Sequence, residues 1–93
     1  MTTYIADDKL EPQGYWQITS LSAAKSIAGG NGRVALIQCL DQNVRWRDDG
    51  TDPTSSVGMR LHAGESMWYV GDITKIRFIE ESAGAELNIT TYQ

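Results

Sequence analysis

Two residue types with special chemistry are almost missing from this sequence, and their scarcity narrows the possible folds and functions. The 93 residues include one cysteine and one histidine. A lone Cys39 cannot close an internal disulfide, so we expect it to be a small buried hydrophobe within the apolar run 34–40. A lone His62, with no cysteine or second histidine at ligand spacing, excludes a zinc site of ordinary composition. We expect His62 to be exposed at a strand end.

Long apolar runs and an excess of positive charge are also lacking. The longest apolar run is far shorter than the ~20 residues that cross a bilayer, and the polar start 1–8 lacks the features of a signal peptide. Eight Lys and Arg residues face 12 Asp and Glu residues, which gives a formal net charge of −4. This balance disfavours binding to a phosphate backbone. We therefore expect a soluble protein made in a cytosol, with no nucleic-acid or membrane partner.

Sequence patterns of catalytic sites and phosphate-binding loops are not found either. No serine lies in a G-x-S-x-G elbow. The segment Gly29-Gly30-Asn31-Gly32 matches neither the Walker pattern nor the dinucleotide-binding pattern. The sequence therefore predicts a protein that is not an enzyme and that needs no cofactor.

Short alternating segments rich in β-branched and aromatic residues make up most of the chain. They recur at intervals of roughly ten residues between turn signals, which predicts an all-β sandwich or barrel with roughly six to eight short strands. Residues 34–40 are expected to form a central strand covered on both faces, and Asp41-Gln42 a tight hairpin turn. Residues 22–28 favour either a short helical turn or an extension of the preceding strand. The expected strands are 15–21, 34–40, 43–47, 59–61, 66–70, 73–79 and 86–92.

The sequence divides into a polar N-terminal segment and one domain. Residues 1–14 are polar and lack an apolar period, so we expect an extended N-terminal arm that is disordered or held by a neighbour. Residues 15–93 are expected to form a single domain.

The clearest loop in this domain is formed by residues 48–56, with three aspartates in the stretch 48–52. We favour a turn in which Asp side chains cap backbone amides; a calcium site is the alternative.

Aromatic and basic residues on the expected strands provide the best candidates for binding. Trp68 and Tyr69 are adjacent, so one of them must point outward. An exposed tryptophan on a sheet stacks on sugars or anchors a protein interface, and interfaces are enriched in tryptophan and arginine. The basic residues near the tryptophans favour the protein interface. The candidate partner-binding residues are Tyr4, Ile5, Arg45, Arg47, Trp68 and Arg77.

One segment resembles small virion proteins of tailed bacteriophages and prophages. The family carries N-V-R-W-R-D-D-G-T-x-P-T, similar to residues 43–54 here, then a G-x-x-L-x-A-G turn, similar to 58–64. A Y-x-G strand end, an I-R-F-I strand and a closing L-N-V-x-Y-like strand are similar to 69–71, 76–79 and 87–92. The resemblance covers about residues 34–92.

The resemblance implies a virion structural protein, a capsid-decorating or cement protein with a jelly-roll β-sandwich, often a trimer. Its expected partners are the major capsid protein or another virion protein, and further copies of itself. It implies no catalytic residues. The competing hypotheses are a carbohydrate-binding or receptor-binding module of a tail or fibre, which rests on the strand tryptophans, and a metal enzyme of cupin type. The cupin-type enzyme needs two or three histidines where the chain has one.

Overall fold

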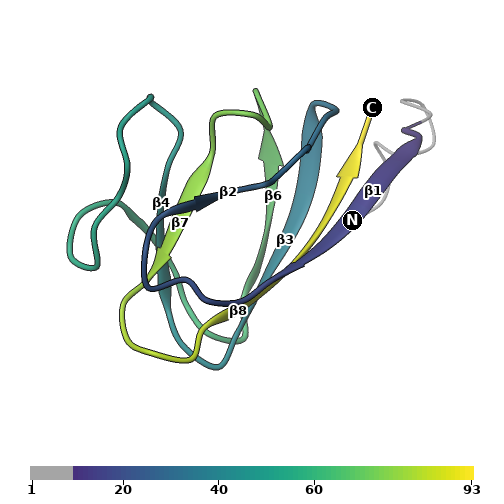
Figure 1. Ribbon diagram of the computed structural model, residues 1–93. Helices are drawn as coiled ribbons and strands as arrows, with labels where there is room; N and C mark the ends of the chain where they lie inside the picture. Colours follow the sequence, from purple (N-terminus) through teal and green to yellow (C-terminus); the bar gives the residue numbers. More distant parts are fainter. Residues whose placement is uncertain (1–9) are drawn as a thin grey trace.

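The computed structural model describes residues 10–93, which form eight β-strands and no helix. The strands lie in two four-stranded sheets in which all neighbours are antiparallel (Figure 1). The first sheet has the order β1-β8-β3-β6, and the second has the order β2-β7-β4-β5. The bounds are β1 Pro12–Ile18, β2 Lys25–Ser26, β3 Val34–Leu40, β4 Val44–Arg47, β5 Met59–Leu61, β6 Ser66–Val70, β7 Arg77–Glu80 and β8 Glu86–Tyr92.

This strand order is that of a jelly roll, in which most consecutive strands cross from one sheet to the other. The expected all-β class and the jelly-roll-like sandwich are confirmed. The described part of the chain also contains no helix long and apolar enough to span a membrane.

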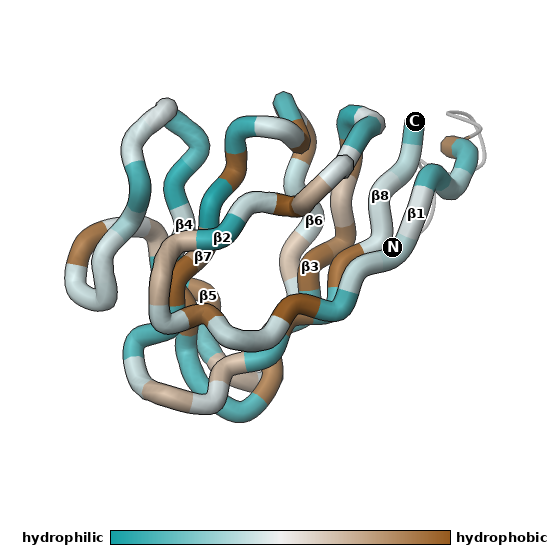
Figure 2. Tube along the Cα trace, in the orientation of Figure 1, coloured by the Kyte–Doolittle hydropathy of each residue, from teal (hydrophilic) through white to brown (hydrophobic). Residues whose placement is uncertain are grey.

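The core lies between the two sheets and follows the two-residue period of the strands. Ile37 of β3 lies opposite Ile89 of β8 in the first sheet, and Phe78 of β7 lies opposite Trp46 of β4 in the second. The first three of these side chains are fully buried, and Trp46 packs against them partly buried. Figure 2 shows brown, hydrophobic segments along strands of both sheets. Val44 of β4 is also fully buried, on the same side of its strand as Trp46.

The expected hairpin at Asp41-Gln42 is wrong. β3 and β4 lie in different sheets, so these two residues form a corner at which the chain crosses the core. Asp41 adopts a positive φ of 74°, a conformation that aspartate tolerates better than most residues. The local sequence shows a tight turn, but it does not show to which sheet the chain returns.

Other expectations need smaller corrections. Residues 22–28 contain no helix; the two-residue strand β2 lies there, between buried Leu21 and Ile27. The inner face of the strand 34–40 is fully buried, whereas its outer face varies from buried Val34 to exposed Gln38, so the strand is not covered on both faces throughout. The strand expected at 73–79 begins only at Arg77, because a turn precedes it.

The boundary of the expected arm also shifts. β1 begins at Pro12, so residues 12–14 belong to the first sheet. Backbone hydrogen bonds in both directions between Glu11 and Gln93, at 2.8 and 2.9 Å, extend this pairing by one residue. Residues 1–9 of the expected arm lie outside the described residues.

Candidate functional site

The two side chains with the most reactive chemistry are both held in structural contacts. Cys39 is buried, and its Sγ donates a hydrogen bond to the carbonyl oxygen of Gln42 at 3.0 Å. Burial raises the pKa of the Cys39 thiol to about 11, so it is protonated at neutral pH. His62 is exposed, as expected, and its Nδ1 lies 3.1 Å from a carboxylate oxygen of Glu65. Among residues 10–93, neither side chain is hydrogen-bonded to a group with which it would form a nucleophile–base pair.

The three aspartates of the 48–52 loop contact three different side chains. Asp48 accepts a hydrogen bond from the Tyr69 hydroxyl at 2.8 Å. Asp49 pairs with Arg47, and Asp52 lies 3.5 Å from the Nε of Arg77. No cluster of three or more metal-binding side chains occurs within residues 10–93. A calcium site requires these carboxylates to converge, and these contacts give each of them a separate partner.

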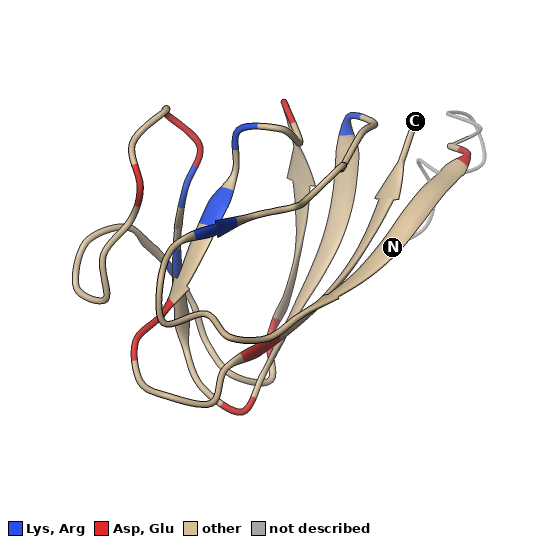
Figure 3. Ribbon diagram, in the orientation of Figure 1, with Lys and Arg blue, Asp and Glu red and all other residues tan. Residues whose placement is uncertain are grey.

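Four arginines lie on the outer face of the second sheet, here called the arginine face. Arg47 is the register partner of Arg77, and Arg45 is the register partner of Arg60. Figure 3 shows the blue segments of β4 and β7 on this side of the sandwich. Because like charges directly opposite each other repel, this arrangement needs acidic partners.

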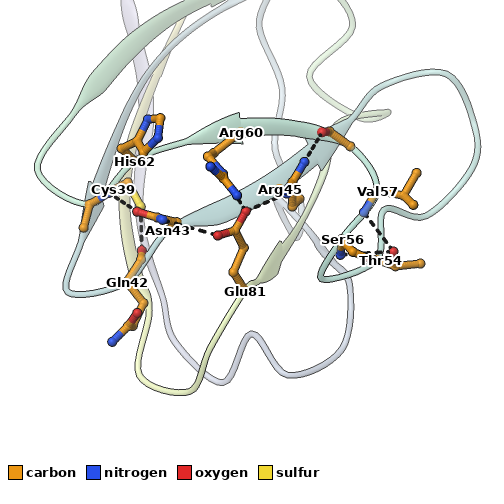
Figure 4. A network of polar contacts seen from close by, with 12 residues as sticks. Cys39, Gln42, Asn43, Arg45, Thr54, Ser56, Val57, Arg60, His62 and Glu81 are labelled. Carbon is orange, nitrogen blue, oxygen red and sulfur yellow. Dashed lines mark hydrogen bonds and ion pairs between the residues drawn. The ribbon is translucent and has the colours of Figure 1, made fainter.

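Glu81, which follows β7, is the acidic partner of two of these arginines (Figure 4). Its carboxylate accepts hydrogen bonds from the Nε of Arg45 at 2.6 Å and from the Nε of Arg60 at 2.7 Å. Asn43 donates a third hydrogen bond at 3.3 Å. These bonds, led by the one from Arg60, hold the pKa of Glu81 below its ordinary value. The carboxylate therefore fixes β4, β5 and the end of β7 to one another.

The other arginine pair is neutralised by the long loop. Arg47 donates two parallel hydrogen bonds to Asp49, at 3.0 and 2.6 Å, and this pairing lowers the pKa of the Asp49 carboxyl. Such a fork geometry fixes direction as well as distance. The arginine face thus has four cations and three carboxylates, and its residual positive charge is small.

A groove of about 550 Å³ lies where β4 ends and β5 begins. Val57 and Met59 are 52% and 61% exposed, so both present apolar surface to solvent at the groove. Trp46 lies beside them because it is the register partner of Met59. The groove is lined by Trp46, Arg47, Asp48, Asp49, Val57, Gly58 and Met59.

Local loop chemistry holds the wall of this groove in place. Thr54 and Val57 form an isolated β-bridge, and the Thr54 hydroxyl oxygen accepts a hydrogen bond from the Val57 backbone N–H at 3.0 Å (Figure 4). Pro53 is buried. Gly58 has a φ of 141°, and a Cβ at this position would lie 3.1 Å from the carbonyl oxygen of Trp46. The groove therefore depends on a threonine, a proline and a glycine at fixed spacing.

The outer face of the first sheet is different in chemistry. Glu86 is the only Asp, Glu, Lys or Arg residue in its four strands, which are almost entirely tan in Figure 3. Tyr15, Trp68 and Val70 are exposed on these strands. We call this surface the neutral face.

The structure separates the predicted site residues into two groups. Arg45, Arg47 and Arg77 lie together on the arginine face, whereas Trp68 lies on the first sheet. Tyr4 and Ile5 lie outside the described residues. The expectation that one of Trp68 and Tyr69 points outward is confirmed, because Trp68 is exposed and Tyr69 is buried.

Sequence reasoning missed Val57 and Met59 as exposed surface residues. Met59 lies on the same face of the second sheet as Trp46, because the two are register partners. Met59 is nevertheless exposed because it lies on the short edge strand β5. No protein-family model matches the chain, and neither a curated protein nor a solved structure matches it.

Proposed function

We propose that the chain is a non-catalytic structural protein of a tailed-bacteriophage virion, which decorates the capsid shell and stabilises it as a homo-oligomer, with a trimer favoured. It is made in the host cytoplasm and resides in the virion. Its partners are the major capsid protein or another virion protein, and further copies of the chain.

The observation that carries the proposal is the composition of the groove. A tryptophan, an arginine and an exposed methionine converge there, and protein interfaces are enriched in these three residue types. Trp46 supplies buried apolar area, Met59 adapts to an irregular partner surface, and Arg47 is held in one direction by Asp49. A groove of this kind suits a ridge or loop of another protein.

The resemblance supports the same surface. Residues 43–54, which resemble the phage virion proteins, supply Trp46, Arg47, Asp48 and Asp49 to the groove. They also supply Arg45 and Asn43, which bind Glu81 beside it. The segment with the most specific likeness therefore builds the surface proposed to contact the shell.

Charge argues for a protein partner over a nucleic acid. Binding to a phosphate backbone needs unpaired lysines and arginines. On the arginine face, each of the four arginines has one carboxylate within ion-pair distance. Glu81 pairs with Arg45 and Arg60, Asp49 pairs with Arg47, and Asp52 pairs with Arg77. The net charge of −4 adds repulsion from phosphate.

The test is co-sedimentation of the purified protein with capsids of its own phage that lack it. Wild-type protein is expected to sediment with the capsids. Met59→Asp places a charge in the groove and should abolish binding. Val70→Asp is the matched control, because Val70 is 71% exposed on the first sheet, and it should bind as the wild type does. Unbound wild-type protein, or equal binding by both variants, would overturn the proposal.

A further inference from the structure

The neutral face carries a row of side chains that crosses all four strands of the first sheet. Tyr15, Thr90, Leu36 and Trp68 are successive register partners, so they lie side by side on one face. At about 4.8 Å between neighbouring strands, the row is ~14 Å long. Its two ends are aromatic and exposed, Tyr15 by 60% and Trp68 by 40%.

A second row of polar side chains runs parallel to the first. Asn88 of β8 is central in this row and bonds both to Tyr15 of the first row and to Gln38 of its own row. It accepts a hydrogen bond from the Tyr15 hydroxyl at 2.6 Å, and its Nδ2 donates to the amide oxygen of Gln38 at 3.0 Å. Side-chain amides and hydroxyls each offer both donors and acceptors. The row consists of the register partners Gln17, Asn88, Gln38 and Ser66.

A hollow of about 220 Å³ lies between the two rows. The aromatic ring of Tyr15 forms one part of its lining, and the amides of Gln38 and Asn88 form another. Ligand sites combine apolar or aromatic surface with a few placed polar groups in this way. The remaining lining residues are Leu36, Ser66, Ile89 and Thr90.

Charge and area identify the chemistry of the occupant. The four described strands of this face carry no cation for a phosphate or carboxylate, and their one acid, Glu86, accepts a hydrogen bond from Gln17. A third row on this face consists of the register partners Tyr92, Val34 and Val70. Four strands and three rows of side chains cover roughly 20 by 20 Å, about 400 Å², which is half of the ~800 Å² that each partner buries in a standard protein interface. A small, uncharged, hydrogen-bonding ligand fits better than a second copy of the chain.

We propose that the neutral face binds a neutral oligosaccharide that lies across the strands. Sugar rings present apolar C–H faces that stack on Tyr15 and Trp68, and their hydroxyls bond to the amides of Gln38 and Asn88. Tyr92 supports one end of this site, since its ring lies 6.0 Å from that of Trp68 at a tilt of 43°. The site uses no residue of the groove, so it is independent of the proposed binding to a capsid.

The experiment measures binding of linear six-unit oligosaccharides of glucose, mannose, galactose and N-acetylglucosamine by titration calorimetry. Binding of at least one neutral oligosaccharide is expected. Trp68→Ala and Tyr15→Ala should each weaken it about tenfold, the size of one stacking contact. Tyr15→Phe keeps the ring and should weaken binding less. Met59→Asp, in the groove, should leave the affinity unchanged.

Three results would overturn the glycan site. The first is no binding to any of the four oligosaccharides, and the second is equal affinity in the wild type and in the two alanine variants. The third is a concentration-dependent dimer, seen by light scattering, that Trp68→Ala abolishes, because a second copy would then occupy the face. Melting curves of each variant separate lost binding from lost folding. Capsid co-sedimentation of the same variants stays at the wild-type level if only the glycan site is affected.

Discussion

Trp46 of β4 and Tyr69 of β6 meet edge to face between the two sheets, with ring centroids 6.1 Å apart and ring planes at 74°. Aromatic pairs favour this geometry. The Tyr69 hydroxyl also donates a hydrogen bond to Asp48 at 2.8 Å. One tyrosine of the first sheet therefore positions both the tryptophan and the first aspartate of the groove.

Tyr69→Phe is expected to destabilise the protein modestly and to loosen the groove. The change keeps the aromatic contact with Trp46 and removes only the hydrogen bond to Asp48, which is worth about 1 kcal/mol. Urea denaturation followed by tryptophan fluorescence measures the free energy of unfolding. Tyr15→Phe, which removes the solvent-exposed hydrogen bond to Asn88 on the other face, is the control and should cost less, because water can replace that bond. An equal loss in both variants would contradict this role of Tyr69.

High pH is expected to destabilise the fold through two buried groups. Burial raises the pKa of Cys39 from 9.0 to about 11 and that of Tyr69 from 10.0 to about 12. The folded state therefore binds these protons more tightly than the unfolded state does. Their contribution to stability is complete below pH 9 and is lost as the pH rises through 11 and 12.

Denaturation midpoints measured from pH 8 to pH 12 check this expectation. Tyr69→Phe should flatten the part of the curve above pH 10. Cys39→Ala should flatten the part that begins near pH 9. A wild-type curve that stays level up to pH 12 would show that neither group is buried in its neutral form.

Glu81→Gln is expected to lower the melting temperature at pH 7. The neutral amide cannot neutralise Arg45 and Arg60, which face each other across β4 and β5. Because the pKa of Glu81 is lowered in the fold, its contribution is present above the ordinary value of 4.5 and is lost as the pH falls through the folded-state pKa. The difference from wild type should therefore shrink in acid.

The control for this change is Glu86→Gln, an acid in the first sheet, which should alter the melting temperature less. Thermal melts at pH 7, 5 and 3 give both the size and the pH dependence of the effect. A difference between wild type and Glu81→Gln that grows in acid would contradict the charge pairing.

Two glycines in the left-handed region provide a matched pair. Gly32 and Gly50 have φ angles of 97° and 89°, so alanine at either position should cost about 1–2 kcal/mol. A Cβ at Gly32 would also lie 2.5 Å from the carbonyl oxygen of Tyr92, whereas a Cβ at Gly50 meets nothing within 4 Å. Gly32→Ala should therefore cost ~1–3 kcal/mol more than Gly50→Ala in urea denaturation. Equal costs would mean that β8 ends further from this turn.

The sequence predicts most strands well, because the apolar side chains that alternate along a strand are the buried ones. Phe78 of β7 and Leu87 and Ile89 of β8 are fully buried, as their alternation indicates. It predicts the connections less well. The turn at Asp41 has the composition of a hairpin, but the choice between returning to one sheet and crossing to the other depends on distant strands.

The candidate site is predictable only in part. Arg45, Arg47 and Arg77 share a face because two-residue periodicity places them there. Their shared neutralisation by Glu81, Asp49 and Asp52 depends on the position of the loop. The separation of Trp68 from these arginines requires the sheet order, which no local pattern of residues contains.

The most direct test of the central claim is an image of the protein on its shell. Electron cryomicroscopy of capsids decorated with the purified protein should show Val57 and Met59 against the shell. The row from Tyr15 to Trp68 should then lie away from that contact. Density in which the neutral face lies against the capsid, or capsids that remain undecorated, would contradict the account.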